Sequence, residues 1–210
     1  MRTMARRGDE LREHILLTAK AVFLEMGFER ASMDEITNRA QTSKHSLYAH
    51  FENKEKLFLA VIELVRGLFL ARLKSPGDYA TKPAEALLLF CAHYVDVLRY
   101  QASVQMLRVS IAETARFPEG AAQHFDVMFT QVETRLAAYL KSTFGLGAKA
   151  STEAAQRLLA QILFPLLPRA LFGLEPLHAD LDGRTASPKT DLRPIRKAVA
   201  DLLASLPPKS

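Results

Sequence analysis

The stretch SMDEITNRAQTSKHSLYAHFENK, Ser32–Lys54, decides how the chain is organised, because two short helical patterns meet in it at a tight turn. Ser32 and Glu35 have the spacing of a capping box, in which each side chain satisfies a backbone donor at a helix start. One face of the segment that follows carries its apolar residues, Met33, Ile36 and Ala40. The sequence therefore predicts a short helix from about Met33 to Ala40.

A second short helix is expected after the turn Gln41-Thr42. Ser43 is a good N-cap, so this helix should run from Lys44 to about His50. Leu47 and Phe51 then point inward. The other side chains are expected to be accessible, with His45, Ser46 and Ala49 pointing out, Tyr48 and His50 on the flanks and Lys44 at the tip.

Two helices joined by a three- to four-residue turn form a helix-turn-helix, whose second helix lies in the DNA major groove. The charge of the segment agrees, because the stretch from Arg39 to Phe51 holds basic residues and histidines and no acid. Ser46 stands where a carboxylate would complete another capping box. The N-terminus of the second helix is therefore expected to be available to a phosphate.

A third helix should start where the quoted stretch ends, with Asn53 as its cap and Lys54 as its first residue. A cation in the first turn opposes the helix dipole by roughly 0.3 to 1 kcal/mol. An external phosphate would reverse the sign of this effect, and residues that break a local rule often serve a function. The alternative is a Lys54 side chain that is simply solvated.

The run I-x-x-x-A-x-x-S-x-x-x-L-Y-x-H-F-x-x-K-x-x-L-F, Ile36–Phe58, resembles the DNA-binding domain of the TetR family of bacterial transcriptional regulators. The resemblance is close over roughly the first quarter of the chain. It implies phosphate contacts at Tyr48, His50 and Lys54, with help from Ser32 and Ser43. It implies base-reading positions at Lys44, His45, Ser46 and Ala49.

The chain departs from the family pattern at three positions in this stretch. Gln41 stands where the family usually has Gly, so it must tolerate any positive φ that the turn requires. Thr37 replaces a usual Ala. His45 stands where a small residue or Pro is common, so the sequence of the bound DNA cannot be borrowed from relatives.

The composition is that of a soluble globular protein, with 210 residues, 49% hydrophobic and 24% charged. A net charge of +5 permits nucleic-acid binding without demanding it. Arg2, Arg6 and Arg7 form a basic arm ahead of the motif, which is either a disordered tail or a contact to a neighbouring minor groove.

The single cysteine, Cys91, rules out a disulfide within the chain and a cysteine-based metal site. It lies on an apolar face and is interpreted as a small core residue. No cofactor and no metal site is expected. Neither a signal peptide before Asp9 nor a long uncharged apolar stretch is present, so we expect no membrane association and a cytoplasmic protein.

The rest of the chain reads as helix, and the expected fold class is all-α. Asp9 can cap a first helix that stops at Gly27, and Lys54–Lys74 forms a connecting helix. Pro165 and Pro168 should kink or break a later helix. The later helices are expected at about Pro83–Tyr100, Ser103–Arg116, Pro118–Phe144, Ser151–Gly173 and Leu192–Ser205. We expect a DNA-binding domain over 1–53 and a helical regulatory and dimerisation domain over 54–210.

The stretch RVSIAETARFPEG, Arg108–Gly120, is similar to the C-terminal domain of one TetR branch, whose members often control efflux or stress genes. Aromatic and sulfur-bearing residues are dense in this half of the chain. They form either ordinary core or an apolar cavity for a small ligand. The candidate ligand-binding residues are Phe90, His93, Tyr94, Met106, Glu113, Phe125, Phe129, Gln161 and Phe164.

The resemblance implies a homodimer that pairs through its last two long helices. The expected apolar stripes are Leu158, Leu159, Ile162 and Leu166, and Ile195, Val199, Leu202 and Leu203, and we expect them to have no partner within the chain. The leading hypothesis is a repressor that a small ligand releases from double-stranded DNA with an inverted repeat. The alternatives are a regulator with a filled core and no ligand, and a helical enzyme. The sequence shows no nucleophile-base pair, metal constellation or phosphate-cradling loop that favours an enzyme.

Overall fold

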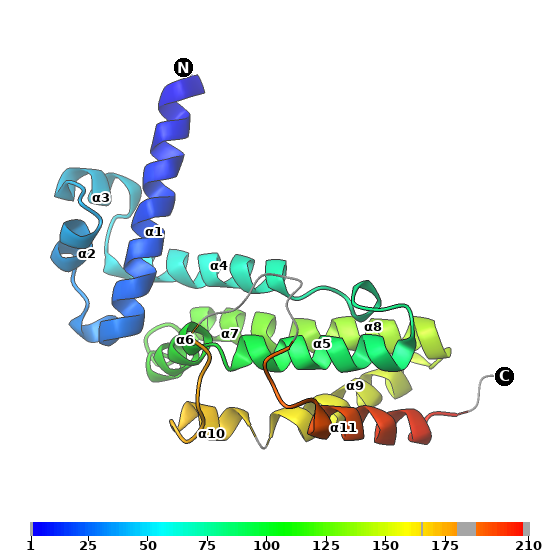
Figure 1. The fold of residues 1–210 in the computed structure, drawn as a ribbon. Helices are drawn as coiled ribbons and strands as arrows, with labels where there is room; N and C mark the ends of the chain where they lie inside the picture. Colours follow the sequence, from blue (N-terminus) through cyan, green and yellow to red (C-terminus); the bar gives the residue numbers. More distant parts are fainter. Residues whose placement is uncertain (1, 165, 180–187, 208–210) are drawn as a thin grey trace. The chain divides into compact units, whose positions relative to one another are not determined.

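The computed structural model describes residues 2–164, 166–179 and 188–207, and the regular elements in these ranges are helices (Figure 1). The all-α prediction is therefore confirmed. Besides the helices, the described residues hold an isolated bridge between Tyr100 and His178. The helices are α1 (Arg2–Arg30), α2 (Met33–Arg39), α3 (Lys44–His50), α4 (Lys54–Arg72), α5 (Pro83–Leu98), α6 (Gln101–Ala112), α7 (Pro118–Phe125), α8 (Gln131–Phe144), α9 (Ala148–Leu163), α10 (Leu167–Leu171) and α11 (Leu192–Ser205).

The chain forms two compact units. Unit 1 contains the residues up to Leu68 together with Arg108–His124, and unit 2 contains Phe69–Leu107 and the residues from Phe125 onward. This division differs from the expected boundary after residue 53. The physical reason is that the first half of α4 packs in unit 1, where the Phe58 ring lies 5.1 Å from the rings of both Phe23 and Phe28.

Helix α1 supplies the apolar wall of unit 1 through the buried residues Ile15, Ala19, Val22 and Phe23. It begins at Arg2 and not at the expected Asp9. At its other end Gly27 has φ 73°, which confirms the predicted stop, because glycine enters this region without steric cost. The side chains of Arg2, Arg6 and Arg7 lie outside the described part of the chain, so the basic arm stays a prediction.

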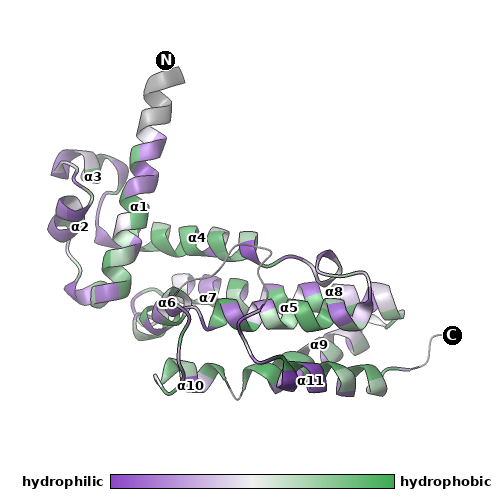
Figure 2. Ribbon diagram, viewed as in Figure 1, coloured by the Kyte–Doolittle hydropathy of each residue, from purple (hydrophilic) through white to green (hydrophobic). Residues whose placement is uncertain are grey.

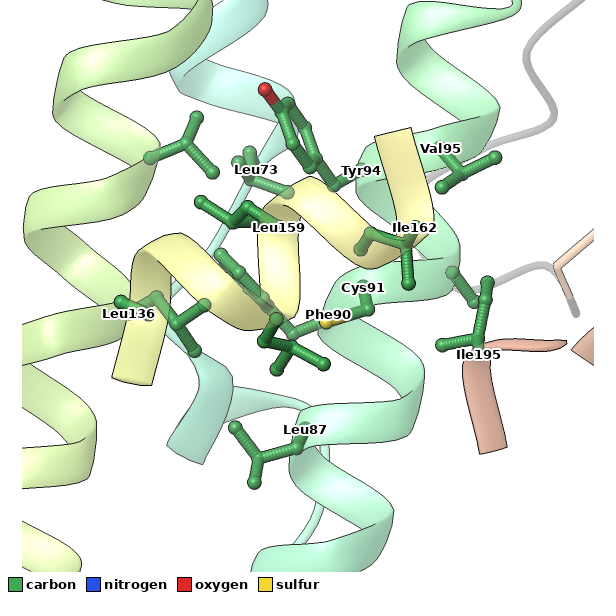
Figure 3. Packing of buried hydrophobic residues seen from close by; sticks show 14 of the residues in the cluster. Leu73, Leu87, Phe90, Cys91, Tyr94, Val95, Leu136, Leu159, Ile162 and Ile195 are labelled. Atoms are coloured by element: carbon green, nitrogen blue, oxygen red, sulfur yellow. The ribbon is translucent and has the colours of Figure 1, made fainter. Parts of the chain in front are cut away.

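Helix α5 forms the centre of unit 2. From Ala86 to Leu98 all its residues are buried except Leu89 and His93, which are half-buried. Figure 3 shows its side chains among those of α8, α9 and α11. Cys91 is fully buried there, and burial raises the pKa of its thiol to about 12, so it is protonated at neutral pH. This agrees with its interpretation as a core residue.

The expected dimerisation stripes require a correction, because they pack inside unit 2. Helices α9 and α11 both contact α5 and each other, and their stripe residues belong to the same core as Phe90 and Cys91. Leu158, Ile162, Ile195, Val199 and Leu202 are between 1% and 6% exposed. The assumption that these stripes lack a partner within the chain was wrong, since α5 is apolar on nearly every side.

The expected helix Pro118–Phe144 is interrupted by a π-helical segment, η2 (Asp126–Thr130). Tyr94 of α5 is fully buried, and its hydroxyl donates to the Met128 backbone carbonyl at 2.7 Å. The expected helix Ser151–Gly173 is likewise two helices, α9 and α10, and Pro168 stands in the first turn of α10. Pro165 lies outside the described residues.

Within the described ranges, no helix is both long enough and apolar enough to cross a membrane.

Candidate nucleic-acid interface

Helix α2 starts as the sequence predicts, but only half of the expected capping box forms. The Ser32 hydroxyl accepts the Glu35 backbone N–H at 3.1 Å. The Glu35 carboxylate accepts from Arg39 at 2.6 Å, and Arg39 also donates to Glu25 at 2.5 Å. These hydrogen bonds lower the pKa of Glu25 and raise that of Arg39. Arg39 is therefore paired within unit 1.

The turn between α2 and α3 requires one residue in the left-handed backbone conformation. This residue is Gln41, with φ 49°. This is the geometry that glycine would supply at lower cost, as expected from the departure at this position. Thr37, another of the departures, is buried, and its hydroxyl donates to the Met33 carbonyl at 2.7 Å. A threonine is tolerated at this buried position in place of the usual Ala because its hydroxyl is hydrogen-bonded within α2.

Helix α3 is capped by Ser43, whose hydroxyl accepts the Ser46 backbone N–H at 3.0 Å and lies 2.9 Å from the Ser46 hydroxyl. Leu47 and Phe51 are buried, as predicted. The guanidinium of Arg12 in α1 lies 5.3 Å from the centre of the Phe51 ring and so covers it. Two inward side chains thus hold the helix on unit 1.

The opposite face of α3 is accessible. Lys44, His45 and Ala49 are exposed, and 48% of Tyr48 is exposed. His50 is half-buried, with its ring 6.3 Å from that of Phe51. Figure 2 shows that α2 and α3 are mostly hydrophilic. A seven-residue helix with this exposed polar face can enter a groove and offer hydrogen bonds there.

Lys44 has a partner that the sequence reasoning missed. Its ammonium lies 2.8 Å from the carboxylate of Asp34 in α2, and this hydrogen bond raises the pKa of Lys44. Asp34 is ten residues away on another helix, so no spacing rule indicates the pair. Both side chains are more than 60% exposed, and such surface pairs open easily. Lys44 can therefore exchange Asp34 for a base.

Lys54 lies in a setting that the sequence did not indicate. Asn53 caps α4 as predicted, since its side-chain oxygen accepts the Lys56 backbone N–H at 2.8 Å. The Lys54 ammonium does not point to solvent alone: it donates to backbone carbonyls at the connection between α1 and α2. Its assignment as a phosphate contact stays a prediction.

A segment from much later in the chain completes unit 1. The Phe117 ring lies 5.0 Å from that of Phe28 and 5.2 Å from that of Phe58, and Arg116 pairs with Glu29 at 2.6 Å. A Cβ on Gly120 would meet Leu59 at 3.0 Å and Ile62 at 3.2 Å. Arg116–Gly120 is the end of the stretch Arg108–Gly120, which was noted for its similarity to a regulatory domain, and it packs against α1 and α4.

The candidate ligand-binding residues differ widely in burial and belong to both units. Phe90 and Tyr94 are fully buried in the core of unit 2, and Met106 is fully buried as well. His93 and Phe129 are half-buried, and the His93 ring lies 5.0 Å from that of Tyr79. Gln161 is exposed, 60% of Phe125 and 77% of Phe164 are exposed, and Glu113 belongs to unit 1. Their assignment to a ligand stays a prediction.

A family model described as bacterial regulatory proteins of the tetR family matches residues 15–61, which contain α2, α3 and the start of α4. A second model, described as the C-terminal domain of AefR-like transcriptional repressors, matches residues 85–186. The chain belongs to the TetR family. This confirms the resemblance noted for Ile36–Phe58, and the TetR family consists of transcriptional regulators.

Individual TetR relatives resemble this chain in sequence over a quarter to most of its length. The transcriptional activator FasR of Mycolicibacterium smegmatis is 47% identical over 55 residues, which cover 26% of this chain and 25% of FasR. The chain aligns with between a quarter and a third of the length of the first curated relatives that it matches.

Solved structures match over nearly the whole chain. A TetR-family regulator from Mesorhizobium loti MAFF303099 has a TM-score of 0.78 at 22% identity and covers 94% of this chain and 97% of its own. The flavonoid-responsive regulator FrrA has a TM-score of 0.72 at 25% identity, with 96% and 100% covered. These matches show that the fold extends through both units.

Proposed function

We propose that this TetR-family regulator is a homodimeric repressor that binds an inverted-repeat operator through α3 and is released by a small ligand. The observation that carries DNA binding is the accessible face of α3. This short helix buries only Leu47 and so contributes little to the core of unit 1. Lys44, His45, Ser46 and Ala49 are the proposed base-reading positions. Tyr48, His50, Ser32 and Ser43 are the proposed phosphate contacts. We propose no catalytic activity and no cofactor for this protein. We propose that it is located in the cytoplasm.

Two recognition helices are needed for specificity, because one short helix reads only a few base pairs. A surface for a second copy is available on unit 2, where Phe164, Phe172 and Leu174 are 77%, 83% and 63% exposed. Exposed apolar surface of this kind is typical of an interface when it is contiguous. We therefore propose that these exposed residues, and not the buried stripes of α9 and α11, form the contact between the two copies. A two-fold dimer requires half-sites about one helical turn or a multiple apart.

Regulated release is supported by the way the chain passes between the units. Helix α6 belongs to unit 2 up to Leu107 and to unit 1 from Arg108, and the helix that begins as α7 continues through η2 into α8. A ligand that prefers one arrangement of unit 2 can act through these continuous helices and through α4 on the DNA-binding helices. The alternative is a regulator without a ligand, which is favoured by the complete burial of Phe90 and Tyr94 in ordinary core.

Footprinting on the DNA around the protein's own gene tests the DNA-binding proposal. We expect protection of an inverted repeat. Selection from random DNA should then return altered sequences for Lys44→Ala and His45→Ala, whereas Tyr48→Phe should weaken operator and non-operator binding by similar factors. A selection that returns the wild-type sequence with both α3 variants would show that α3 does not read bases.

The dimer and ligand proposals need separate measurements. Phe172→Glu should give monomers by light scattering, while Lys141→Glu on the exposed surface of α8 should leave the mass unchanged. A mass unaffected by Phe172→Glu places the interface elsewhere. For the ligand, a melting temperature that rises with the concentration of an apolar or cationic compound supports a binding site, and no rise across a broad set favours the ligand-free regulator.

A further inference from the structure

The ammonium of Lys54 is occupied by the protein itself. Its Nζ donates to the backbone carbonyls of Phe28 at 3.0 Å, Ala31 at 3.1 Å and Glu29 at 3.4 Å. A lysine ammonium has three donors and no acceptor. Each of its N–H groups therefore has a backbone partner, and a phosphate oxygen could bind only by displacing one of them.

These carbonyls have a reason to need a cation. Gly27 ends the regular part of α1, and the chain makes one more turn to Arg30 before Ser32 caps α2. Carbonyls at the end of a helical turn lack partners within it and carry the negative end of the helix dipole. A lysine side chain near such an end satisfies them and is stabilised by the dipole. This also explains why a cation is tolerated in the first turn of α4.

The position of the ammonium is fixed further by an aromatic ring. Lys54 Nζ lies 4.3 Å from the centre of the Phe28 ring, within the range of a cation–π interaction. Phe28 is 1% exposed and packs against Phe23, Phe58 and Phe117. The Arg116 guanidinium lies 5.0 Å from the same ring. Phe28, whose ring lies next to the Lys54 ammonium, is thus itself fixed by contacts with α1, with α4 and with the segment before α7.

We infer that Lys54 is a positioning residue and not a phosphate contact: it joins the start of α4 to the α1–α2 connection and thereby fixes how α2 and α3 leave α1. The inference rests on the proposed DNA-binding function only for its effect on affinity. Arginine is not an equivalent substitute, because its planar guanidinium spreads its donors and does not direct three of them from one nitrogen.

Substitution separates this role from a phosphate contact. Lys54→Met keeps most of the aliphatic stem and removes the ammonium, and Lys56→Met, at an exposed position two residues further along α4, is the matched control. We expect Lys54→Met to lower the melting temperature of the free protein by about 4 to 8 °C. Operator binding should weaken at least about ten-fold at every salt concentration, so the slope of log K against log salt stays that of the wild type. Lys54→Arg should weaken binding similarly, and Lys56→Met should leave the melting temperature unchanged.

A phosphate contact predicts different results. Lys54→Met would then flatten the salt slope by about one unit, and Lys54→Arg would bind nearly as the wild type does. Either result overturns the inference, with or without a change in melting temperature.

Chemical labelling tests the same point in the unmodified protein, in case Lys54→Met does not fold. Reductive methylation followed by mass spectrometry should modify Lys54 much more slowly than Lys56 in the free protein, and operator DNA should not slow it further. Equal rates for the two lysines without DNA, or protection of Lys54 only with DNA, would overturn the inference. A wild-type protein that binds no DNA would refute the proposed function, while the melting and labelling results without DNA would still decide the role of Lys54.

Discussion

Helices α3 and α11 both present an apolar stripe to the rest of the chain, but the surrounding sequence specifies them to different degrees. The ends of α3 and the direction of Leu47 follow from its immediate neighbours, the N-cap Ser43 and the turn at Gln41. The ends of α11 also match the prediction, but its stripe does not say what covers it, and the covering helix is α5, about a hundred residues earlier. The ends of a helix and the direction of its side chains can therefore be predicted from one segment. The element that covers an apolar stripe depends on the whole chain.

A substitution in the α11 stripe should have the largest effect on stability. Leu202 is 6% exposed in the core of unit 2. We expect Leu202→Ala to lower the free energy of unfolding by about 2 to 5 kcal/mol, because it removes buried methyl groups and leaves a cavity. Urea unfolding at several protein concentrations measures this, with Ala200→Ser on the exposed side of α11 as control. A variant of normal stability that dissociates a dimer would mean that the stripe is an interface after all.

A polar contact in the same core gives the next largest effect. Tyr94→Phe leaves the Met128 carbonyl without its side-chain donor, which should lower the free energy of unfolding by about 1 to 3 kcal/mol. Tyr139→Phe, on α8 against the same core, is the matched control and should change little. Hydrogen exchange should also become faster in η2 with Tyr94→Phe. Unchanged exchange there would show that the hydroxyl does not stabilise the π-helical segment.

Unit 1 contains a buried histidine that makes stability depend on pH. His124 is 1% exposed, its Nδ1 lies 2.7 Å from the Ser110 hydroxyl, and burial lowers its pKa from 6.5 to about 4. Because the folded state holds the neutral ring, its contribution is present above about pH 6.5 and is lost as the pH falls toward 4. The loss should reach roughly 2 kcal/mol at pH 5. Urea midpoints from pH 7.5 to 5 should fall more steeply for the wild type than for His124→Asn, and parallel curves would exclude this histidine as the cause.

The smallest effect concerns the turn of the helix-turn-helix. Gln41→Gly should stabilise the chain by about 0.5 to 1 kcal/mol, because a residue with a Cβ is strained at φ 49°. Thr42→Gly, one residue further along, should instead destabilise, since Thr42 does not have a positive φ. Thermal melting of both variants measures this. A loss of stability with Gln41→Gly would mean that the Gln41 side chain contributes more than its backbone costs.

The same division explains how much of the fold and the site could be predicted. The caps Ser32, Ser43 and Asn53 and the stop at Gly27 each depend on residues within four positions, and all occur as expected. The exposure of Lys44, His45 and Ala49 follows from the same local reasoning.

Partners distant in sequence could not be predicted. Lys54 binds carbonyls 23 to 26 residues away, and Lys44 meets Asp34 from another helix. The aromatic residues proposed to line a ligand site share a composition but no spacing, so nothing in the sequence distinguishes those inside the core from those on its surface.

The π-helical segment has a consequence for the periodicity of the helix that contains it. From α7 to α8 a buried residue stands at every fourth position: Gly120, His124, Met128, Val132, Leu136 and Leu140, with Val127 and Ala137 buried beside this series. In an uninterrupted α-helix each step of four advances about 40° beyond a full turn, so five steps would rotate the stripe by about 200° and carry Leu140 to the side opposite Gly120. The wider turn at Asp126–Thr130 takes up an extra residue and returns about 100° of that rotation. An apolar period of four, longer than the 3.6-residue period of a straight α-helix, is thus the pattern that such a segment leaves in a sequence.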